Sequence, residues 1–324
     1  MMSLATAQAW IESNFSRLGT EQIPLASAVG RVLARPLAPL TATGRVSAID
    51  GFAVRAAATE GASDYAPLPI ETVPIVAGAI LPAGTDAVLP AHWLEPSGAL
   101  AAVAVGENVA PPDPLALAPG LLRPPHIAAL ARRGETTLEV VRRPTVLVHI
   151  AGPKSGPDAI GPMLRALLAS LGAQPGQRSP DLVLHAGRSG FGADDDGALA
   201  FDAIASRGIR INPGETTTIG TIGGVPAVLL PGDPLACLIA FTLLAAPALH
   251  RLAGRSAPAP VQAKLDRKIV STLGQVDAVR VRLHDGIATP AAPSLAAEAD
   301  GLVLVPEGSE GYPAGAIIAI SPLP

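Results

Sequence analysis

The stretch PTVLVHIAG, residues 144–152, decides the fold class predicted for this chain of 324 residues. An unbroken apolar run that ends in glycine is typical of a strand covered on both faces of a sheet. A segment with helical spacing follows at 161–173 (GPMLRALLASLGA), and residues 181–192 (DLVLHAGRSGFG) repeat the strand and the glycine-rich loop. Strand, helix and strand in this order predict an α/β domain built on a parallel sheet.

The same alternation continues toward the C-terminus. Residues 197–208 (GALAFDAIASRG) are predicted to form a second helix, and residues 225–234 (VPAVLLPGDP) a third strand. A last helix is predicted over 235–254, with Asp233 as its N-cap and Pro234 at its first position. We therefore expect helices on both faces of the sheet.

The flanking segments have a different texture. Residues 3–18 and 123–134 have helical spacing, while 23–109 and 261–324 contain short apolar runs separated by proline and glycine, as in β-rich domains. The predicted fold class is multidomain α/β plus β. Its parts are an elongated helical domain (1–24 and 110–142), a β-rich domain (25–109), an α/β domain (143–255) and a C-terminal β domain (256–324).

Composition and charge exclude several classes of protein. The net charge of −4 leaves no basic footprint for nucleic acid. The single cysteine, Cys237, lies in an apolar run and is predicted to be a packing residue. The N-terminus lacks the features of a signal peptide, and the most apolar stretch (235–249) is shorter than the roughly 20 residues that span a bilayer. We predict a cytoplasmic protein that binds neither nucleic acid nor membrane.

Three predicted strand ends carry residues suited to an anionic ligand. They are HIAGPKSG (149–156), HAGRSGFGADDD (185–196) and LLPGDP (229–234). The carboxyl ends of parallel strands meet at one sheet edge, where ligands of α/β proteins bind. Glycines allow close backbone approach, helix N-termini favour phosphate, and a guanidinium such as that of Arg188 holds phosphate bidentately. The alternative is that the glycines serve turn geometry alone.

Acidic and imidazole side chains near these loops have two interpretations. The run Asp194, Asp195 and Asp196 is either the capped start of a helix or a Mg²⁺ site, since Mg²⁺ takes one or two carboxylates together with substrate oxygens. His149 and His185 lie at strand ends, and no third ligand at a recognisable metal-site spacing accompanies them. We therefore do not predict these histidines as metal ligands.

Several motifs in the same order resemble the molybdopterin molybdotransferases, the family that includes the gephyrin E domain. GRVLARPLAP (30–39) and SAIDGFAVR (47–55) are similar to the family's GRVLA and SAMDGYAVR. Residues 77–90, 210–254 and 274–308 contain segments that resemble further family motifs. The likeness extends over nearly the whole chain.

The resemblance implies four domains, a homodimer and an active site between domains of two subunits. The family takes adenylylated molybdopterin (molybdopterin-AMP) and molybdate, releases AMP with Mg²⁺, and forms molybdenum cofactor. Asp50 matches the carboxylate of the family's MDGYAV motif, so its implied role is catalytic, in cleavage of the adenylyl phosphate. The alternative is a turn aspartate before Gly51. A molybdoenzyme or another protein of cofactor biosynthesis is a further implied partner.

The family's loop motifs imply the remaining site residues. The implied substrate-binding residues are Gly187, Arg188, Ser189, Pro213, Gly214, Glu215, Pro231, Gly232, Asp233 and Arg280. The predicted metal ligands are Asp158, which matches the aspartate of the family's DSN motif, and Asp195, which belongs to the acidic run at 194–196.

Several of these positions depart from the family's residues. The family's TGDEL is AGPKSG at 151–156, which lacks its two carboxylates. Glu215 replaces the lysine of the family's PGKP, and Asp233 replaces the asparagine of LPGNP. Arg188 restores one positive charge, and Arg280 matches an arginine of the family's C-terminal pattern, whose first arginine is replaced by Gln275. Inside a cleft, such changes disfavour a polyanion by several kcal/mol at an effective dielectric constant of about 20.

Two functions therefore stay open from the sequence. The first is molybdenum insertion into molybdopterin-AMP with release of AMP, impaired at neutral pH by the altered charges. The second is a non-catalytic molybdopterin-binding or chaperone-like paralogue that keeps the fold and the dimer. An enzyme for another nucleotide-like substrate is a third possibility.

Overall fold

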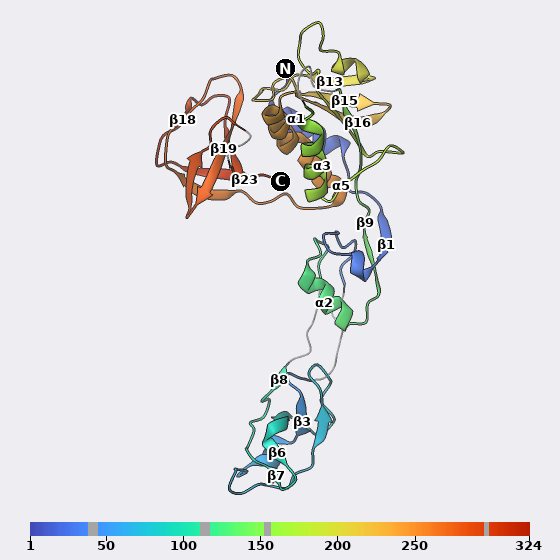
Figure 1. The fold of residues 1–324 in the computed structure, drawn as a ribbon, viewed down its shortest axis with the longest axis vertical. Coiled ribbons are helices and arrows are strands. Elements are labelled where there is room, and N and C mark those ends of the chain that lie inside the picture. Colours follow the sequence, from blue (N-terminus) through green and yellow to red (C-terminus); the bar gives the residue numbers. More distant parts are fainter. Residues whose placement is uncertain (38–44, 111–116, 152–156, 295–297) are drawn as a thin grey trace. The chain divides into compact units, whose positions relative to one another are not determined.

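The chain divides into two compact units. A computed structural model describes residues 1–37, 45–110, 117–151, 157–294 and 298–324. Unit 1 comprises Met1–Arg35 and Pro119–Pro324, and unit 2 comprises Pro36–Ala118 (Figure 1). The predicted β-rich domain began at residue 25, but the backbone from Val32 to Ala34 pairs with the strand at 137–141 and so belongs to unit 1. The predicted strand end at 152–156 lies outside the described residues.

The α/β part of unit 1 contains a six-stranded sheet. Its strands, in spatial order, are β11 (Gln174–Pro175), β10 (Thr145–Ile150), β12 (Leu182–Ala186), β16 (Val225–Leu230), β15 (Thr218–Ile222) and β13 (Ala203–Arg207). The first four run parallel, β15 pairs antiparallel with β16, and β13 pairs antiparallel with β15. The sheet is therefore mixed, where a parallel sheet was predicted. Gly223 and Gly224, both with positive φ, form the two-residue turn that makes β15 and β16 a hairpin.

The helix predicted at 197–208 is wrong. The segment forms a short 3₁₀ turn, η4 (Gly197–Ala200), followed by the edge strand β13. The strand pairs with β15, where an added Cβ at Gly220 would lie 2.1 Å from the carbonyl oxygen of Ala203. Glycine at 220 therefore allows a close strand contact that local helical composition cannot reveal.

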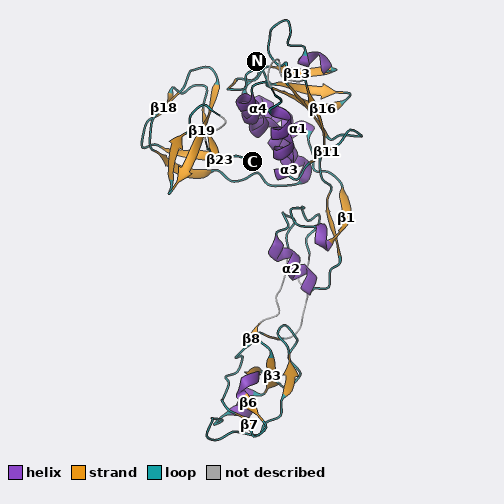
Figure 2. Cartoon of the chain, in the orientation of Figure 1, coloured by secondary structure: helices purple, strands orange, loops and turns teal. Residues whose placement is uncertain are grey.

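The helices of the α/β part share one core. They are α1 (Leu4–Asn14), α3 (Ile160–Ser170), α4 (Pro234–Ala240), the π-helical η5 (Phe241–Ala245) and α5 (Ala246–Ala253), which gather together in Figure 2. The sheet residues of this core alternate along their strands, as Leu182 and Leu184 do in β12, so they belong to one face. Helices on both faces were expected. Cys237 is fully buried in this core, which confirms its packing role.

The last helical segment runs without interruption from Pro234 to Ala253. Among the described residues it alone is long and apolar enough to cross a membrane, and 67% of its most apolar window is buried within this structure. Its apolar side chains pack on α1 and on the sheet. Burial in the core accounts for its composition.

A β-ribbon and a short helix form the rest of the N-terminal part of unit 1. The ribbon pairs β1 (Thr20–Pro24) with β9 (Thr137–Val141), next to the turn η1 (Leu25–Ser27). The predicted helix at 123–134 is α2 (Pro124–Arg132), with proline at its start and Gly134 (φ 81°) after its end. Helix α1 packs in the α/β core, although the sequence grouped residues 1–24 with 110–142.

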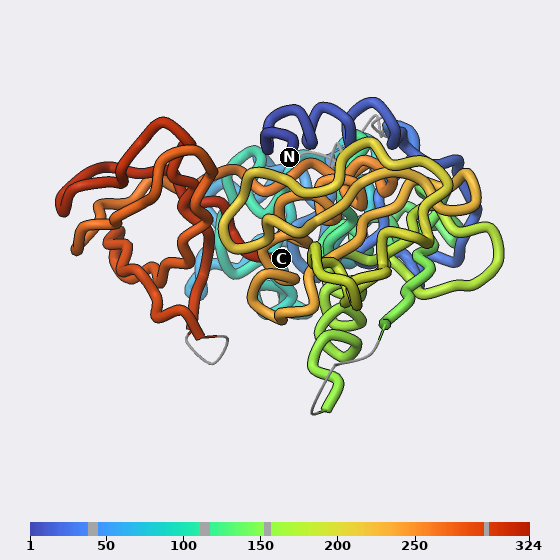
Figure 3. The backbone as a smooth tube through the Cα atoms, turned by 90° about the horizontal axis from the view of Figure 1, so that it is seen from above, coloured from blue at the N-terminus to red at the C-terminus, as the bar shows by residue number. Residues whose placement is uncertain are grey.

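The C-terminal part of unit 1 is a small barrel, drawn in orange and red in Figure 3. Its strands are β17 (Val261–Leu265), β19 (Val276–His284), β20 (Ile287–Pro290), β21 (Gly301–Val305) and β23 (Ile317–Pro322). Strand β19 pairs with both β20 and β21, which closes the ring. A side ribbon pairs β18 (Ile269–Val270) with β22 (Gly311–Tyr312), and β14 (Ile211–Asn212) joins β19 from the α/β part.

Unit 2 is β-rich, as predicted. Its elements are β2 (Val46–Ser47), β3 (Gly51–Val54), η2 (Ala56–Thr59), β4 (Val73–Ile75), β5 (Ala87–Pro90), η3 (Ala91–Trp93), β6 (Leu94–Glu95), β7 (Gly98–Ala99) and β8 (Val109–Ala110). Strand β3 lies between β4 and β5. A Cβ at Gly51 would lie 2.3 Å from the Leu89 carbonyl oxygen, so the residue after Asp50 must be glycine for β3 and β5 to pair.

Candidate functional site

A pocket of unit 1 lies at the carboxyl ends of β10, β12 and β16. It has a volume of about 510 Å³, which is within the usual range for small-molecule sites. Its wall is built by the loops that follow the three strands and by the turn at 215–216. The predicted site residues in the wall are Asp158, Gly187, Arg188, Ser189, Asp195, Glu215, Pro231, Gly232 and Asp233. We call this the strand-end pocket.

Glycines bring two of these loops close together. A Cβ at Gly232 would lie 3.4 Å from the Cα of Gly187, and the Gly187 N–H donates to the Leu230 carbonyl at 3.1 Å. Gly187 has φ 91°, and Arg188 follows it with φ 49°, a region that non-glycine residues rarely occupy. Strained backbone of this kind clusters at ligand sites, where surrounding structure holds it in place.

The polar groups of the loop after β12 are already engaged with neighbours. The Arg188 guanidinium is about half exposed and lies 3.3 Å from the Asp196 carboxylate. The Ser189 hydroxyl is 2.8 Å from that of Thr216. Thr216 also lines the pocket, and sequence reasoning missed it because no motif marks a threonine that reaches a neighbouring loop.

The carboxylates of the pocket bind the backbone amides that a phosphate would use. Asp233 caps α4 by accepting from the Ala236 N–H at 2.9 Å, and Asp158 accepts from the first two N–H groups of α3. Glu215 accepts from the Gly214 N–H at 3.2 Å, and Asp195 from the Gly192 N–H at 3.2 Å. The helix N-termini predicted to hold phosphate are therefore partly occupied by the protein's own side chains.

The charge of the strand-end pocket is strongly negative. Among the described residues that line it are four carboxylates, at Asp158, Asp195, Glu215 and Asp233, and one guanidinium, at Arg188. An anionic ligand meets net repulsion in such a pocket unless cations accompany it. No group of three or more His, Cys, Asp or Glu residues in the described part of the chain has the geometry of a metal site.

Three predicted residues of unit 1 do not line the strand-end pocket. Gly214 (φ 128°) is buried next to Ile211. Pro213 and Arg280 line a second hollow of about 390 Å³, next to the barrel. The buried Arg280 guanidinium donates to the carbonyls of Ala292 and Ser294, and burial lowers its pKa. These contacts indicate that Arg280 ties the 291–294 segment to β19.

Asp50 belongs to unit 2, so it is described separately from the strand-end pocket. Its carboxylate is exposed, and Oδ1 accepts from the Ala77 N–H at 2.8 Å. It lies at a shallow hollow whose wall is otherwise apolar, with Phe52, Pro74 and Ile80 among its residues. The Asp50 carboxylate thus stabilises the turn through its hydrogen bond with the Ala77 N–H. The side chain is also exposed to solvent at the edge of the apolar hollow.

Two histidines meet at the ends of β10 and β12. His149 Nδ1 lies 3.2 Å from His185 Nε2, with the rings edge to face. Burial lowers the pKa of His185 below 6.5, the nearby His149 lowers it further, and Asp196 opposes both. A histidine buried in its neutral form binds protons less readily in the folded chain than in the unfolded chain.

We expect this pair to make stability depend on pH. Because the folded-state pKa of His185 is depressed, its contribution is complete above pH 6.5 and decreases as the pH falls toward the folded-state pKa. Urea unfolding at pH 7 and pH 5 should show a lower free energy of unfolding at pH 5. The loss should be smaller in His185→Gln and unchanged in His284→Gln, whose imidazole is exposed. Equal losses in the two variants would show that His185 is not responsible.

Comparison with known proteins places the chain in a family. A model of the MoeA N-terminal region (domain I and II) matches residues 2–134, and a model of the MoeA C-terminal region (domain IV) matches residues 262–323. The chain belongs to the molybdopterin molybdotransferase (MoeA) family. Together the two matches cover more than half of the sequence, and the residues between them include the strand-end pocket.

The family members compared with this chain are distant from it in sequence but similar to it in fold. A molybdopterin molybdenumtransferase of Staphylococcus epidermidis is 25% identical, with 85% of this chain and 84% of the relative aligned. A Staphylococcus aureus enzyme of the same name is 23% identical over the same shares. The crystal structure of the molybdopterin biosynthesis moeA protein from Pyrococcus horikoshii OT3 covers 99% of this chain and 100% of its own, with a TM-score of 0.75 and 22% identity. The chain is thus a divergent MoeA-family member with the family's multidomain fold.

Proposed function

We propose that the protein inserts molybdenum into adenylylated molybdopterin, with release of AMP. The observation that carries the proposal is the strand-end pocket, which lies at the ligand-binding edge of an α/β sheet in a MoeA-family chain. Curated relatives along most of the chain are molybdopterin molybdenumtransferases. The pocket is large enough for a nucleotide-sized ligand and has backbone amides, hydroxyls and one guanidinium in its wall.

Individual residues have distinct roles in this proposal. Gly187 and Gly232 let the substrate approach the backbone of two loops, and Arg188 and Ser189 orient its phosphate. Asp50 is the proposed catalytic carboxylate, which acts on the adenylyl phosphate. Asp50 belongs to unit 2, and the loops proposed to bind the substrate belong to unit 1.

Mg²⁺ fits the donor set of the strand-end pocket when the substrate supplies further oxygens. Asp158 and Asp195 both line the pocket, and Mg²⁺ is commonly held by one or two carboxylates together with phosphate oxygens. When bound, the ion neutralises phosphate charge. A pocket with four carboxylates and one guanidinium favours a substrate that binds together with such a cation.

The altered charges favour a family member whose substrate binding is weakened. Glu215 and Asp233 both line the pocket at positions where the family pattern has lysine and asparagine. This observation keeps a second candidate, a non-catalytic molybdopterin-binding or chaperone-like paralogue. Calorimetric titration with molybdopterin-AMP, followed by a test for molybdate-dependent AMP release with Mg²⁺, distinguishes the two. Binding without release supports the paralogue, and release supports the enzyme.

We further propose that the protein is a cytoplasmic homodimer that serves a molybdoenzyme or another protein of cofactor biosynthesis. The proposal rests on family membership. The apolar stretch at 235–249 is largely buried in the core of one chain, so its composition does not by itself require a second subunit. Sedimentation should show a species of about twice the monomer mass of 32.6 kDa at micromolar concentration. A monomer under those conditions would contradict the dimer.

A further inference from the structure

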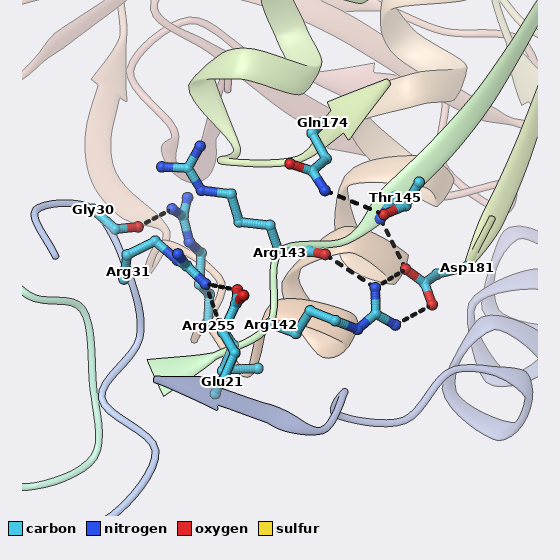
Figure 4. Close-up of polar contacts among 10 residues, drawn as sticks. Glu21, Gly30, Arg31, Arg142, Arg143, Thr145, Gln174, Asp181 and Arg255 are labelled. Carbon is cyan, nitrogen blue, oxygen red and sulfur yellow. Dashed lines mark hydrogen bonds and ion pairs between the residues drawn. The ribbon is translucent and has the colours of Figure 1, made fainter. Parts of the chain in front are cut away.

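A cluster of arginines lies at the end of β10 opposite to the strand-end pocket. Arg142 and Arg143 precede β10, Arg31 lies in the turn before the 32–34 segment, and Arg255 follows α5. Figure 4 shows the guanidinium groups of Arg143, Arg255 and Arg31 one beneath another. With Val32, Val141, Pro144 and Ala253 these residues line one small hollow, far from the proposed substrate site in the sheet. We call it the arginine hollow.

Backbone carbonyls hold two of the guanidinium groups in place. Arg255 Nη2 donates to the Gly30 carbonyl at 2.6 Å. The buried Arg31 donates to the Val141 carbonyl at 2.9 Å and forms an ion pair with Glu21. Arg142 points toward Asp181, with which it makes two hydrogen bonds of 2.7 and 3.0 Å (Figure 4). Two cationic groups are thus fixed in orientation before any ligand arrives.

Positive charge in the hollow exceeds the negative charge that faces it. Glu21 pairs with Arg31, and Asp181 pairs with Arg142, but within the described part of the chain no carboxylate forms an ion pair with Arg143 or Arg255. Burial lowers the pKa of Arg255, and the positive charges of Arg143 and Arg31 lower it further. Like charges this close repel one another, and a bound anion would reduce the repulsion between these guanidinium groups.

The backbone makes room for this arrangement. A Cβ at Gly172 would lie 2.4 Å from Arg255 Nη2, and Gly172 has φ 72°, a conformation that other residues rarely adopt. Glycine at this position therefore lets the guanidinium enter the hollow. Arg143 is exposed, and among the described residues no hydrogen bond fixes its guanidinium, so it is free to turn toward a ligand held by the other two.

We propose that the arginine hollow binds a small tetrahedral dianion of the phosphate, sulfate or molybdate type. Three guanidinium groups from segments far apart in sequence offer donors and charge suited to such an oxyanion. The hollow has a volume of about 10 Å³, little more than one water molecule needs, so the ion binds at its mouth, beside the exposed Arg143 and the partly exposed Arg255, and not inside it. The bound ion joins the 30–32 turn, the connection between β9 and β10, and the end of α5, so it stabilises the junction of these elements.

Calorimetric titration with inorganic phosphate, and separately with molybdate, at fixed ionic strength tests the proposal. We expect the unmodified protein to bind the ion. The affinity of Arg143→Gln should be lower by about tenfold or more, because this variant loses a charged hydrogen-bond donor. Arg165→Gln, which removes an exposed charge from α3 outside the hollow, should bind as the unmodified protein does. The ion that binds more tightly, phosphate or molybdate, identifies the ligand to which the hollow is better suited. Either preference is consistent with the proposal.

A second variant separates this site from the substrate pocket. Arg188→Gln removes the guanidinium of the strand-end pocket, so it should leave the binding of the ion by the arginine hollow unchanged. The ion should also raise the thermal unfolding midpoint of the unmodified protein and of Arg188→Gln, and raise that of Arg143→Gln much less. Absence of binding, equal affinity in Arg143→Gln, or loss of binding in Arg188→Gln would overturn the proposal. None of these results depends on molybdopterin-AMP turnover.

Discussion

Replacing Asp50 by asparagine is expected to reduce molybdate-dependent AMP release by about 100-fold or more, the scale at which a positioned catalytic carboxylate acts. The change removes the charge and keeps the volume. The asparagine side-chain oxygen can still accept from the Ala77 N–H, which Asp50 Oδ1 binds at 2.8 Å, so the turn at 75–79 should be kept. The measurement compares AMP release and thermal unfolding of the two proteins.

Asp64→Asn is the matched control for Asp50. Asp64 is an exposed aspartate of unit 2, and its replacement makes the same change in net charge. Because the unmodified chain is expected to be slow, both variants should also be made in the Glu215→Lys, Asp233→Asn background, where the rate is higher. Turnover that is the same in Asp50→Asn as in Asp64→Asn would leave Asp50 as a turn residue only.

Exchange of Glu215 for lysine should tighten binding of molybdopterin-AMP by roughly tenfold or more, on the rule that ~1.4 kcal/mol is one decade. Glu215 lines a pocket in which four carboxylates accompany one guanidinium, so the exchange reverses a charge where repulsion is strongest. Glu215 is exposed, and water and salt screen part of the Coulomb energy, which limits the gain.

The double variant should bind more tightly still. Asp233→Asn removes another negative charge, and asparagine is as good an N-cap as aspartate, so the start of α4 should be preserved. Glu12→Lys makes the same charge reversal on α1, outside the pocket wall, and should leave affinity unchanged. Calorimetric titration provides the affinities. If Glu215→Lys gains no more than Glu12→Lys does, the Glu215 carboxylate does not limit substrate binding.

The position of the strand-end pocket was predictable, because it follows from local sequence and from a general rule of α/β sheets. Apolar strands that end in glycine predicted β10, β12 and β16, and the structure brings their following loops to one pocket. The pair Asp233 and Pro234 predicted the start of α4, and the Asp233 side chain caps it as expected. Signals contained within a few residues were sufficient in these cases.

Errors arose where contacts between distant segments decide the structure. The segment at 203–207 has a helical local composition, but it forms a strand because β15 offers an edge with Gly220 in its middle. The glycine pair at 223–224, between two apolar runs, was the available signal for a hairpin and for antiparallel strands. Reading it would have predicted a mixed sheet.

Contacts between distant segments also decide how the side chains of the strand-end pocket and of the arginine hollow are placed. Thr216 reaches Ser189, and Arg280 turns toward the 291–294 segment, because of packing that no motif records. The arginine hollow joins residues near positions 31, 143 and 255, which only the folded chain brings together. Motifs indicated which loops matter, but not which polar groups the protein already uses for its own backbone.

AMP release from molybdopterin-AMP in the presence of Mg²⁺, with and without molybdate, is the measurement that tests the proposed activity most directly. We predict release that depends on molybdate, slow for the unmodified chain at neutral pH and faster for the Glu215→Lys, Asp233→Asn variant. Release that does not depend on molybdate, or no release from either protein, would contradict molybdenum insertion by this chain.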